Sequence, residues 1–420
     1  MSLHISDVHA WEILDARGRP TVEIGLRDGR SGTLGRSTVP SMVFTDSHPA
    51  TDPADRIRTR RPRRDVRTTL AQVEGQIRDL LLSRVFTDQA DLDSALTGLG
   101  ASEVEEQPAA GTVLGVSLAA ARSFARDEEL WRSLAPDPAR ASMPVPFLTM
   151  IEGKDSEPSE GLLAFRELMV VPLGARDERA AVLAGARIHR AVGARLAQAG
   201  HAPALGELGG HAPDVHLVEQ ALGILTAAIA DAGYRAGSDS VAIAIRPAAD
   251  ALRRADGRYT IAGQRLTSME LVDCYAMLVR EFPLCAVIDG LAERDREGWT
   301  ALTDRIGRQV QVVGGRIFGT DPALIAKAKD DKIGNAVLLT PAQAGTVTET
   351  LETLAYCRSS GYAPLLSHHA GETTDDFIAD LAVGAGCGQI AAGAPIHGEN
   401  TAKYNRLTHI EQTAKLPYGR

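Results

Sequence analysis

Charged and histidine side chains border several short apolar segments of the chain, in positions from which they could act on a small molecule. Arg246 directly follows the segment VAIAI, Asp289 follows CAVI, and His368 and His369 lie just beyond APLL. Guanidinium groups hold carboxylates through charge-assisted hydrogen bonds, whereas carboxylates and imidazoles move protons. Binding a small carboxylic acid and moving protons on it is therefore one chemistry that these residue types permit.

Short apolar runs recur through the second part of the sequence, and helical stretches separate them. The runs are RELMVV, PALG, VAIAI, CAVI, VQVV, AVLL, APLL and GQI. Strands that are apolar on both faces and are joined by helices predict a parallel sheet, and about eight such units predict a closed (β/α)8 barrel. The active residues of such a barrel lie at the carboxyl ends of its strands.

The N-terminal part of the chain has a different pattern. Residues 22–35 are typical of a β-hairpin around the turn dipeptide Asp28-Gly29, and apolar residues recur at helical spacing from residue 66 onward. Prolines then interrupt the chain before the barrel runs begin. We predict an α/β protein with an N-terminal α+β domain over 1–134, a proline-rich linker over 135–146 and a (β/α)8 barrel over 147–420.

Composition and charge narrow the classes of function. The 420 residues are 44% hydrophobic and 24% charged, which is typical of a globular protein in solution. The net charge of -9 argues against nucleic acid as a partner, because phosphate contacts require a basic surface. No apolar run is long enough to span a bilayer, and the N-terminus does not resemble a leader. We expect a cytoplasmic protein whose ligand is a small carboxylate, with no membrane partner.

Several sequence blocks together resemble the enolase family, the phosphopyruvate hydratases. They are EILDARGRPTVE, SMPVP, GELGGHAP, IDGL, TVTETL, SHHAGET and AKYN, and they occur in enolase order across nearly the whole chain. The resemblance implies an N-terminal α+β capping domain, an enolase-type (β/α)8 barrel and a homodimer.

The resemblance also implies positions for magnesium ligands, and other side chains occupy them here. Enolases hold the cation with three carboxylates, and the matching positions are Arg246, Ile288 and Gly315. None of these side chains offers an oxygen to a hard cation, and the charge of Arg246 would repel one. We therefore expect neither a metal nor another cofactor.

The proton-transfer positions implied by the resemblance are changed as well. The two active-site lysines of the family fall at Thr340 and Ala391, and the glutamate that helps to expel hydroxide falls at Leu208. Glu167 and His368 match active-site residues of the family. The resemblance therefore implies that part of the site is kept and that its base and acid are replaced.

We predict a site of charged residues and histidines at the barrel mouth. The candidates for proton transfer are Glu167, His368 and His369, and those for substrate binding are Arg246, Arg316 and Asp289. One hypothesis is a metal-independent lyase or isomerase, without phosphopyruvate hydratase activity, that acts on a small carboxylic acid in specialised metabolism. The alternative is a catalytically silent pseudoenzyme, in which these charges only neutralise one another and the protein binds a ligand or a protein partner.

Two further features have simpler interpretations. The arginine run within 56–67 could attract nucleic acid or an acidic partner, but a charge run usually forms a solvated face, and aromatic residues for base stacking are missing nearby. Cys387 could be a nucleophile, but a buried and inert thiol is the more common case. We place both outside the site.

Overall fold

The chain folds into two compact units in the computed structural model. Residues 2–30, 32, 34–43, 65–99, 108–126, 128–153, 165–202, 204–215 and 217–419 are described. The first unit comprises Met1–Ala141, Leu339–Ala355 and Ser367–Gly386, and the second comprises Ser142–Leu338, Tyr356–Leu366 and Cys387–Arg420. The arginine run before residue 65 lies outside the described residues.

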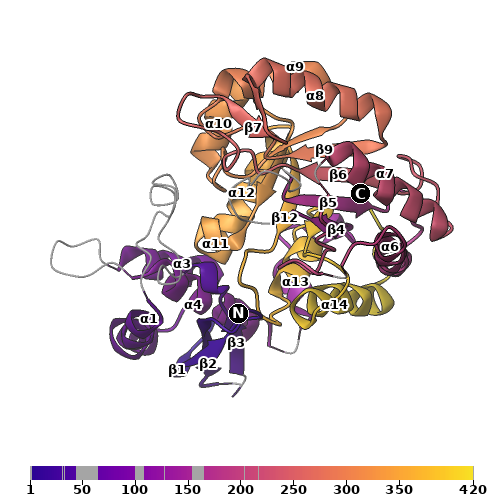
Figure 1. The fold of residues 1–420 in the computed structure, drawn as a ribbon. Coiled ribbons are helices and arrows are strands. Elements are labelled where there is room, and N and C mark those ends of the chain that lie inside the picture. The colour runs from indigo at the N-terminus through magenta and orange to yellow at the C-terminus, as the bar shows by residue number, and fades with distance from the viewer. Residues whose placement is uncertain are drawn as a thin grey trace. The chain divides into compact units, whose positions relative to one another are not determined.

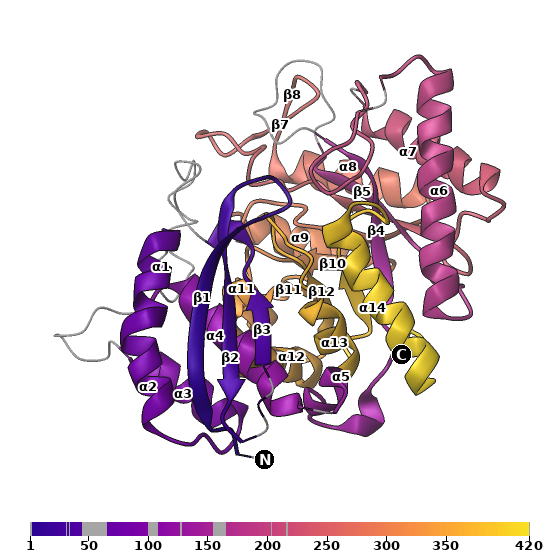
Figure 2. The same ribbon diagram turned by 90° about the horizontal axis from the view of Figure 1, so that it is seen from below.

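A small antiparallel sheet opens the first unit (Figure 2). Its strands are β1 (Ile5–Leu14), β2 (Pro20–Asp28) and β3 (Leu34–Thr38), in the order β1-β2-β3. β2 and β3 pair with Glu23 opposite Thr38 and Arg27 opposite Leu34, which confirms the hairpin predicted for this segment. Helix α4 (Ala110–Ala125) packs on β2 and β3 and is buried along almost its whole length.

The remaining elements of the first unit are short. They are η1 (Ser41–Val43), α1 (Val66–Gln72), η3 (Val73–Ile77), α2 (Arg78–Ser83), α3 (Gln89–Gly98), α5 (Leu130–Ser133), η4 (Pro138–Arg140), α11 (Pro341–Ala344), α13 (Phe377–Gly384) and most of α12 (Val347–Ser359). Asp65 caps α1 by accepting a hydrogen bond from the backbone N–H of Thr68. The helical spacing that begins at residue 66 thus forms α1 and α2, with a wider π-helical turn between them.

A closed eight-stranded barrel forms the second unit (Figure 1). Its strands are β4 (Val145–Glu152), β5 (Glu167–Val171), β6 (Ala242–Arg246), β9 (Leu284–Ile288), β10 (Gln311–Gly314), β11 (Ala336–Leu339), β12 (Ala363–Ser367) and β13 (Gln389–Ala391). The prediction of an all-parallel sheet is wrong at one strand, because β5 pairs antiparallel with both β4 and β6.

The predicted set of strands is also wrong at one position. The described residues of the run PALG, 204–206, form no strand, and Leu205 makes only an isolated bridge to His211. The strand that completes the barrel is β4, which begins at Val145 inside the segment predicted as a linker. Proline was the misleading signal, because a proline near the start of a strand is compatible with pairing.

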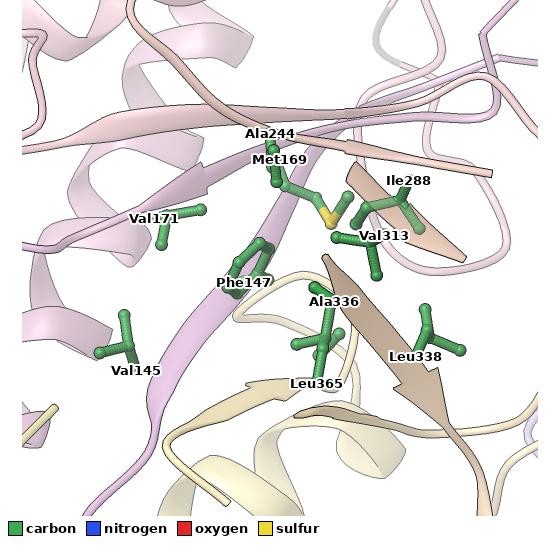
Figure 3. Close-up of a cluster of buried hydrophobic side chains, with 12 residues drawn as sticks. Val145, Phe147, Met169, Val171, Ala244, Ile288, Val313, Ala336, Leu338 and Leu365 are labelled. Carbon is green, nitrogen blue, oxygen red and sulfur yellow. The ribbon is translucent and has the colours of Figure 1, made fainter. Parts of the chain in front are cut away.

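The barrel interior is filled by side chains from alternating strand positions (Figure 3). Phe147, Met169, Val171 and Ile288 are at most 3% exposed and belong to one buried hydrophobic cluster. Residues two apart on a strand point to the same face, so Glu167 continues the inward row of Met169 and Val171. The inward row therefore changes from apolar to charged where it reaches the end of the barrel.

Helices surround the barrel of the second unit. They are α6 (Glu178–Gln198), α7 (Val218–Asp231), α8 (Ser268–Glu281), α9 (Arg296–Ile306), α10 (Pro322–Asp330) and α14 (Gly398–Ala414), and the hairpin β7 (Tyr259–Ile261) and β8 (Gln264–Leu266) precedes α8. Within the described part of the chain, no helix combines the length and apolar character needed to cross a bilayer.

Candidate active site

Three charged residues form a row across adjacent barrel strands. Glu152 ends β4, Glu167 begins β5 and Arg246 ends β6. The register places Glu152 opposite Glu167, and Glu167 opposite Arg246. Because β5 is antiparallel to both neighbours, its first residue lies at the same edge as the last residues of β4 and β6. Asp289 directly follows β9, which pairs with β6.

Arg246 joins the carboxylates of two neighbouring strands. Its Nη1 donates a hydrogen bond of 3.1 Å to Oε1 of Glu167, and its Nη2 lies 3.5 Å from Oδ2 of Asp289. Burial alone would lower the pKa of Arg246, but the charges of Glu167 and Asp289 outweigh burial and raise that pKa. The guanidinium is therefore held firmly in its charged form, and the structure brings together these three predicted site residues.

Arg246 retains one donor. Its Nε is buried and has no hydrogen-bond partner among the described residues. A buried N–H without a partner costs free energy, and an anion placed beside it would recover that cost. The Arg246 side chain as a whole is 25% exposed.

Glu167 is fixed from a second direction. The hydroxyl of Thr149 on β4 donates a hydrogen bond of 2.9 Å to its Oε2, while Oε1 accepts from Arg246. Only 3% of Glu167 is exposed. The two contacts fix the orientation of this carboxylate at the end of the barrel.

Asp289 links β9 to the turn after β10. Its Oδ1 accepts backbone N–H bonds from Gly315 at 2.8 Å and from Arg316 at 3.3 Å. Asp289 has a φ of 50°, in the left-handed region that aspartate and asparagine adopt more readily than other non-glycine residues. Arg316 thus joins the cluster through its backbone N–H.

Glu152 is a candidate that the sequence pattern did not indicate. Strict alternation from Phe147 and Thr149 would point residue 151 inward and Glu152 outward. The register of β4 against β5 shifts between Thr149 and Ile151, however, and this bulge turns Glu152 to the face that Glu167 occupies. A β-bulge has no reliable signal in a single sequence, which explains the omission.

The loop after α6 holds the Glu152 carboxyl group. The backbone N–H of Leu208 lies 3.0 Å from both carboxyl oxygens, and the N–H of Gly210 donates to Oε1 at 2.6 Å. Burial raises the pKa of Glu152 to about 7, although these backbone donors act in the opposite direction. A carboxyl group with such a pKa is suited to proton transfer near neutral pH.

Two stacked histidines fix the same loop from behind. The rings of His189 on α6 and His211 lie 4.3 Å apart, and Nε2 of His189 is 2.8 Å from the carbonyl oxygen of Gly209. Burial lowers the pKa of His189 to about 4 and also lowers that of His211. These imidazoles are therefore neutral supports of the loop at physiological pH.

His368 and His369 belong to the first unit, just after β12. They line a cavity of about 30 Å³ together with Thr38, Glu372 and other residues of that unit. The backbone N–H of His369 donates to Oε1 of Glu372 at 3.0 Å. The predicted role of both imidazoles in proton transfer stays a prediction.

Cys387 matches the interpretation of an inert thiol. Its side chain is 4% exposed, and its Sγ lies 3.6 Å from the carbonyl oxygen of Pro364. Burial raises the pKa of this thiol to about 11, so the thiolate is scarcely populated at neutral pH.

The charged row does not fit the magnesium site that the resemblance implies. Arg246 stands between Glu167 and Asp289 and occupies both carboxylates. Across the ranges described above, no group of three or more His, Cys, Asp or Glu side chains has a geometry that could hold a metal ion. Ile288 is part of the apolar barrel cluster. Because Arg246 takes up both carboxylates, this set of residues does not offer a divalent cation the free oxygen ligands that it requires.

Both parts of the chain match family models. The model described as "Enolase, C-terminal TIM barrel domain" matches residues 140–416, and "Enolase, N-terminal domain" matches residues 5–133. These matches and the closed barrel confirm the predicted α/β fold, in which an N-terminal domain precedes an enolase-type barrel. A curated enolase from Rubrobacter xylanophilus is 39% identical over 410 residues, which cover 97% of this chain and 94% of the relative. The chain therefore belongs to the enolase family.

Proposed function

We propose that this protein catalyses the enolase reaction, the reversible removal of water from 2-phosphoglycerate to give phosphoenolpyruvate. The observation that carries the proposal is the 39% identity to a curated enolase over 97% of the chain. The two family models match residues 5–133 and 140–416, so the similarity is not confined to a common barrel.

This proposal replaces the function predicted from the sequence. The prediction of a protein without phosphopyruvate hydratase activity is wrong, and so is its alternative of a silent pseudoenzyme, because the similarity to a curated enolase extends over almost the entire chain. That prediction gave a few substituted positions more weight than the sequence as a whole.

This chain would perform the reaction with arginine side chains at the substrate carboxylate. We infer that it is a divergent enolase, in which Arg246, Ile288 and Gly315 occupy the positions of the family's carboxylate ligands. Arg246 and Arg316 would bind the substrate carboxylate and stabilise the negative charge that develops on it, and the charged state of Arg246 supports this role. Asp289 would hold Arg246 in place through its ion pair.

Glu167 would remove the proton from C2 of the substrate. Its contacts with Arg246 and Thr149 orient the carboxylate beside the guanidinium that would bind the substrate. The electron pair of the broken C–H bond then forms the C2–C3 double bond, and the hydroxyl group leaves C3 as water. His368 and His369 are additional candidates for proton transfer on the strength of the family resemblance alone.

We also propose a ligand class, a cellular location and an oligomeric state for this protein. We infer a small carboxylate as ligand, a cytoplasmic location and a homodimer, with no membrane or nucleic-acid partner. The acidic net charge of -9 and the enolase blocks of the sequence support these inferences.

A steady-state assay tests the proposed function. Purified protein is mixed with 2-phosphoglycerate, and the ultraviolet absorbance of the product enol is followed. We expect turnover within the ordinary enzyme range, roughly 1 to 10³ per second. Glu167→Gln should lower kcat by roughly 10² to 10⁴-fold, because it retains shape without basicity. A parent protein that forms no product above the protein-free blank would contradict the proposal.

A further inference from the structure

We propose that Glu152 is the residue that protonates the leaving hydroxyl group of the substrate, an inference that rests on the proposed enolase reaction. The proposal joins three observations: the register of Glu152 with Glu167, the backbone cradle around its carboxyl group, and the different partners of the two glutamates.

Glu152 lies where a proton donor could cooperate with the proposed base. It stands directly opposite Glu167 in the antiparallel pair of β4 and β5. Directly opposed residues have Cβ atoms about 4.5 to 5.5 Å apart, so the two carboxyl groups face the same small volume. One substrate molecule could therefore contact both groups.

The loop that carries Leu208 is shaped around the Glu152 carboxyl group. A Cβ atom added to Gly206 would lie 2.4 Å from Oε2 of Glu152, and one added to Gly210 would lie 3.0 Å from Oε1. Real Cβ atoms do not approach oxygen as closely as the first distance, so the loop requires glycine at 206 while Glu152 holds this position. Gly206 and Gly210 of the GELGG block thus form a cradle for the carboxyl group.

The cradle also relates Glu152 to the acid that the resemblance implies. The family's glutamate for expelling hydroxide falls at Leu208, whose side chain cannot donate a proton. The backbone N–H of Leu208 lies 3.0 Å from the Glu152 carboxyl oxygens. The carboxyl group of Glu152 on β4 therefore contacts the backbone at Leu208, the position where the family carries its glutamate. We infer that Glu152 supplies the acid that is absent at position 208.

The two facing glutamates have opposite electrostatic surroundings. Glu167 pairs with Arg246, whereas within the described part of the chain Glu152 accepts its hydrogen bonds from neutral backbone N–H groups. Burial, together with the charge of Glu167, raises the pKa of Glu152 to about 7. When the environments of two neighbouring carboxyl groups differ in this way, one group keeps its proton and the other is ionised. Here Glu152 keeps the proton and Glu167 is the carboxylate.

Other titratable groups lie on the elements that hold Glu152. They include Arg166 beside Glu167 at the start of β5, Glu207 and His211 in the loop, and His189 on α6. The charge of Arg166 lowers the pKa of Glu152, but its effect is smaller than that of burial. Both imidazoles have lowered pKa values and are therefore neutral near pH 7. They add no positive charge that would offset the effect of burial on the pKa of Glu152.

The proton balance of the reaction closes with this pair. Glu167 accepts the C2 proton, the C–H electrons form the double bond, and the C3–O bond breaks with its electron pair on oxygen. Glu152 gives its proton to that oxygen, and water leaves. Glu167 is then protonated and Glu152 ionised, and return of the proton from Glu167 to Glu152, directly or through solvent, restores both residues.

The test compares two isosteric variants of buried glutamates in the same unit. Glu152→Gln retains an oxygen for the loop N–H groups but removes the acid, and Glu178→Gln is the matched control. Glu178 is fully buried and carries a raised pKa of about 8. It is the first residue of α6, which follows the C-terminal end of β5, whereas Glu167 lies at the N-terminal end of that strand. We expect Glu152→Gln to lower kcat by roughly 10² to 10⁴-fold with little change in KM, and Glu178→Gln to leave kcat unchanged.

The pH profile separates proton donation from a structural role. Activity of the parent should fall as the pH rises through about 7, where Glu152 loses its proton, and this limb should disappear in Glu152→Gln. Glu152→Asp, which keeps an acid, should restore part of kcat. An active parent whose Glu152→Gln variant keeps both kcat and the alkaline limb would overturn the proposal.

A titration without substrate distinguishes failure of this proposal from failure of the proposed function. Carbon NMR of the parent labelled at glutamate carboxyl groups should show a carboxyl group that titrates near neutral pH and is missing from Glu152→Gln. Absence of that resonance would overturn the proposal even in an active enzyme or a poorly folding variant. An inactive parent that retains the resonance would instead contradict the enolase reaction and support Glu152 as a proton holder.

Discussion

Arg246 and Glu167 face each other across the β5–β6 pair and are joined by a hydrogen bond of 3.1 Å between Nη1 and Oε1. The pairing depends on the reversed direction of β5, which brings the first residue of that strand to the end of the barrel where β6 finishes. The positive Arg246 and the negative Glu167 therefore lie together at one end of the apolar barrel core. Nη2 of Arg246 contacts Asp289 on its other side.

Replacing Arg246 should destabilise the second unit. Arg246→Met removes the guanidinium that contacts the buried Glu167 and Asp289, leaving Arg166 at 4.0 Å as the cation beside Glu167. We expect a loss of roughly 3 kcal/mol in the free energy of unfolding, at the low end for a buried pair because 25% of the Arg246 side chain is exposed. Denaturant unfolding measures this loss. Arg195→Ala, which breaks the exposed pair with Asp231, is the control and should have little effect. Equal midpoints for Arg246→Met and the parent would refute the ion-pair account.

The loop glycine that packs on Glu152 should resist substitution. Gly206→Ala places a methyl group 2.4 Å from Oε2 of Glu152, so either the loop or the carboxyl group must move. Such overpacking costs roughly 1 to 3 kcal/mol, and activity should fall at least about tenfold. Gly223→Ala on α7 has no atom within 4 Å of the added methyl group and should raise Tm slightly. Similar melting curves and rates for the two variants would argue against the cradle.

Stability should depend on pH through Glu178. Burial raises its folded-state pKa from 4.5 to about 8, and the unfolded chain therefore binds fewer protons than the folded chain within that window. The contribution of Glu178 is fully present below pH 4.5 and is lost as the pH rises through about 8. Thermal melts should show a smaller fall in Tm over this window in Glu178→Gln than in the parent. Parallel curves for the two proteins would be inconsistent with a buried, neutral Glu178.

Association should be measurable in solution. The family resemblance of the DARGRPTVE and AKYN blocks implies a homodimer, and sedimentation at micromolar concentration should give about twice the chain mass of 44.6 kDa. A single species near 44.6 kDa would establish a monomer instead.

The amphipathic and apolar patterns of the sequence predicted most of the architecture. The hairpin of β2 and β3 and seven of the eight barrel strands follow from turn residues and apolar runs, because these signals are local. Two features did not follow. The proline at the start of β4 resembled a linker, and the direction of β5 depends on long-range pairing that a strand's own residues do not encode.

The site residues at positions named by the family resemblance could be predicted from the sequence. The residue whose orientation depends on a β-bulge could not. Arg246, Glu167 and Asp289 were predicted and lie together. Glu152 was missed because a bulge near Met150 reverses the alternation of β4, and its partners are backbone N–H groups of a loop distant in sequence. The function predicted from the substituted positions was wrong, since isolated substitutions do not outweigh similarity along the entire chain.

The central claim is that this chain interconverts 2-phosphoglycerate and phosphoenolpyruvate, and approach to equilibrium from both sides tests it most directly. Purified protein is incubated with each compound in separate samples, and the two phosphorus resonances are followed by NMR. The account predicts that both samples converge on the same ratio of the two compounds, and that Arg246→Met slows this convergence severely. Spectra that stay unchanged in both samples, with folded protein present throughout, would contradict the claim.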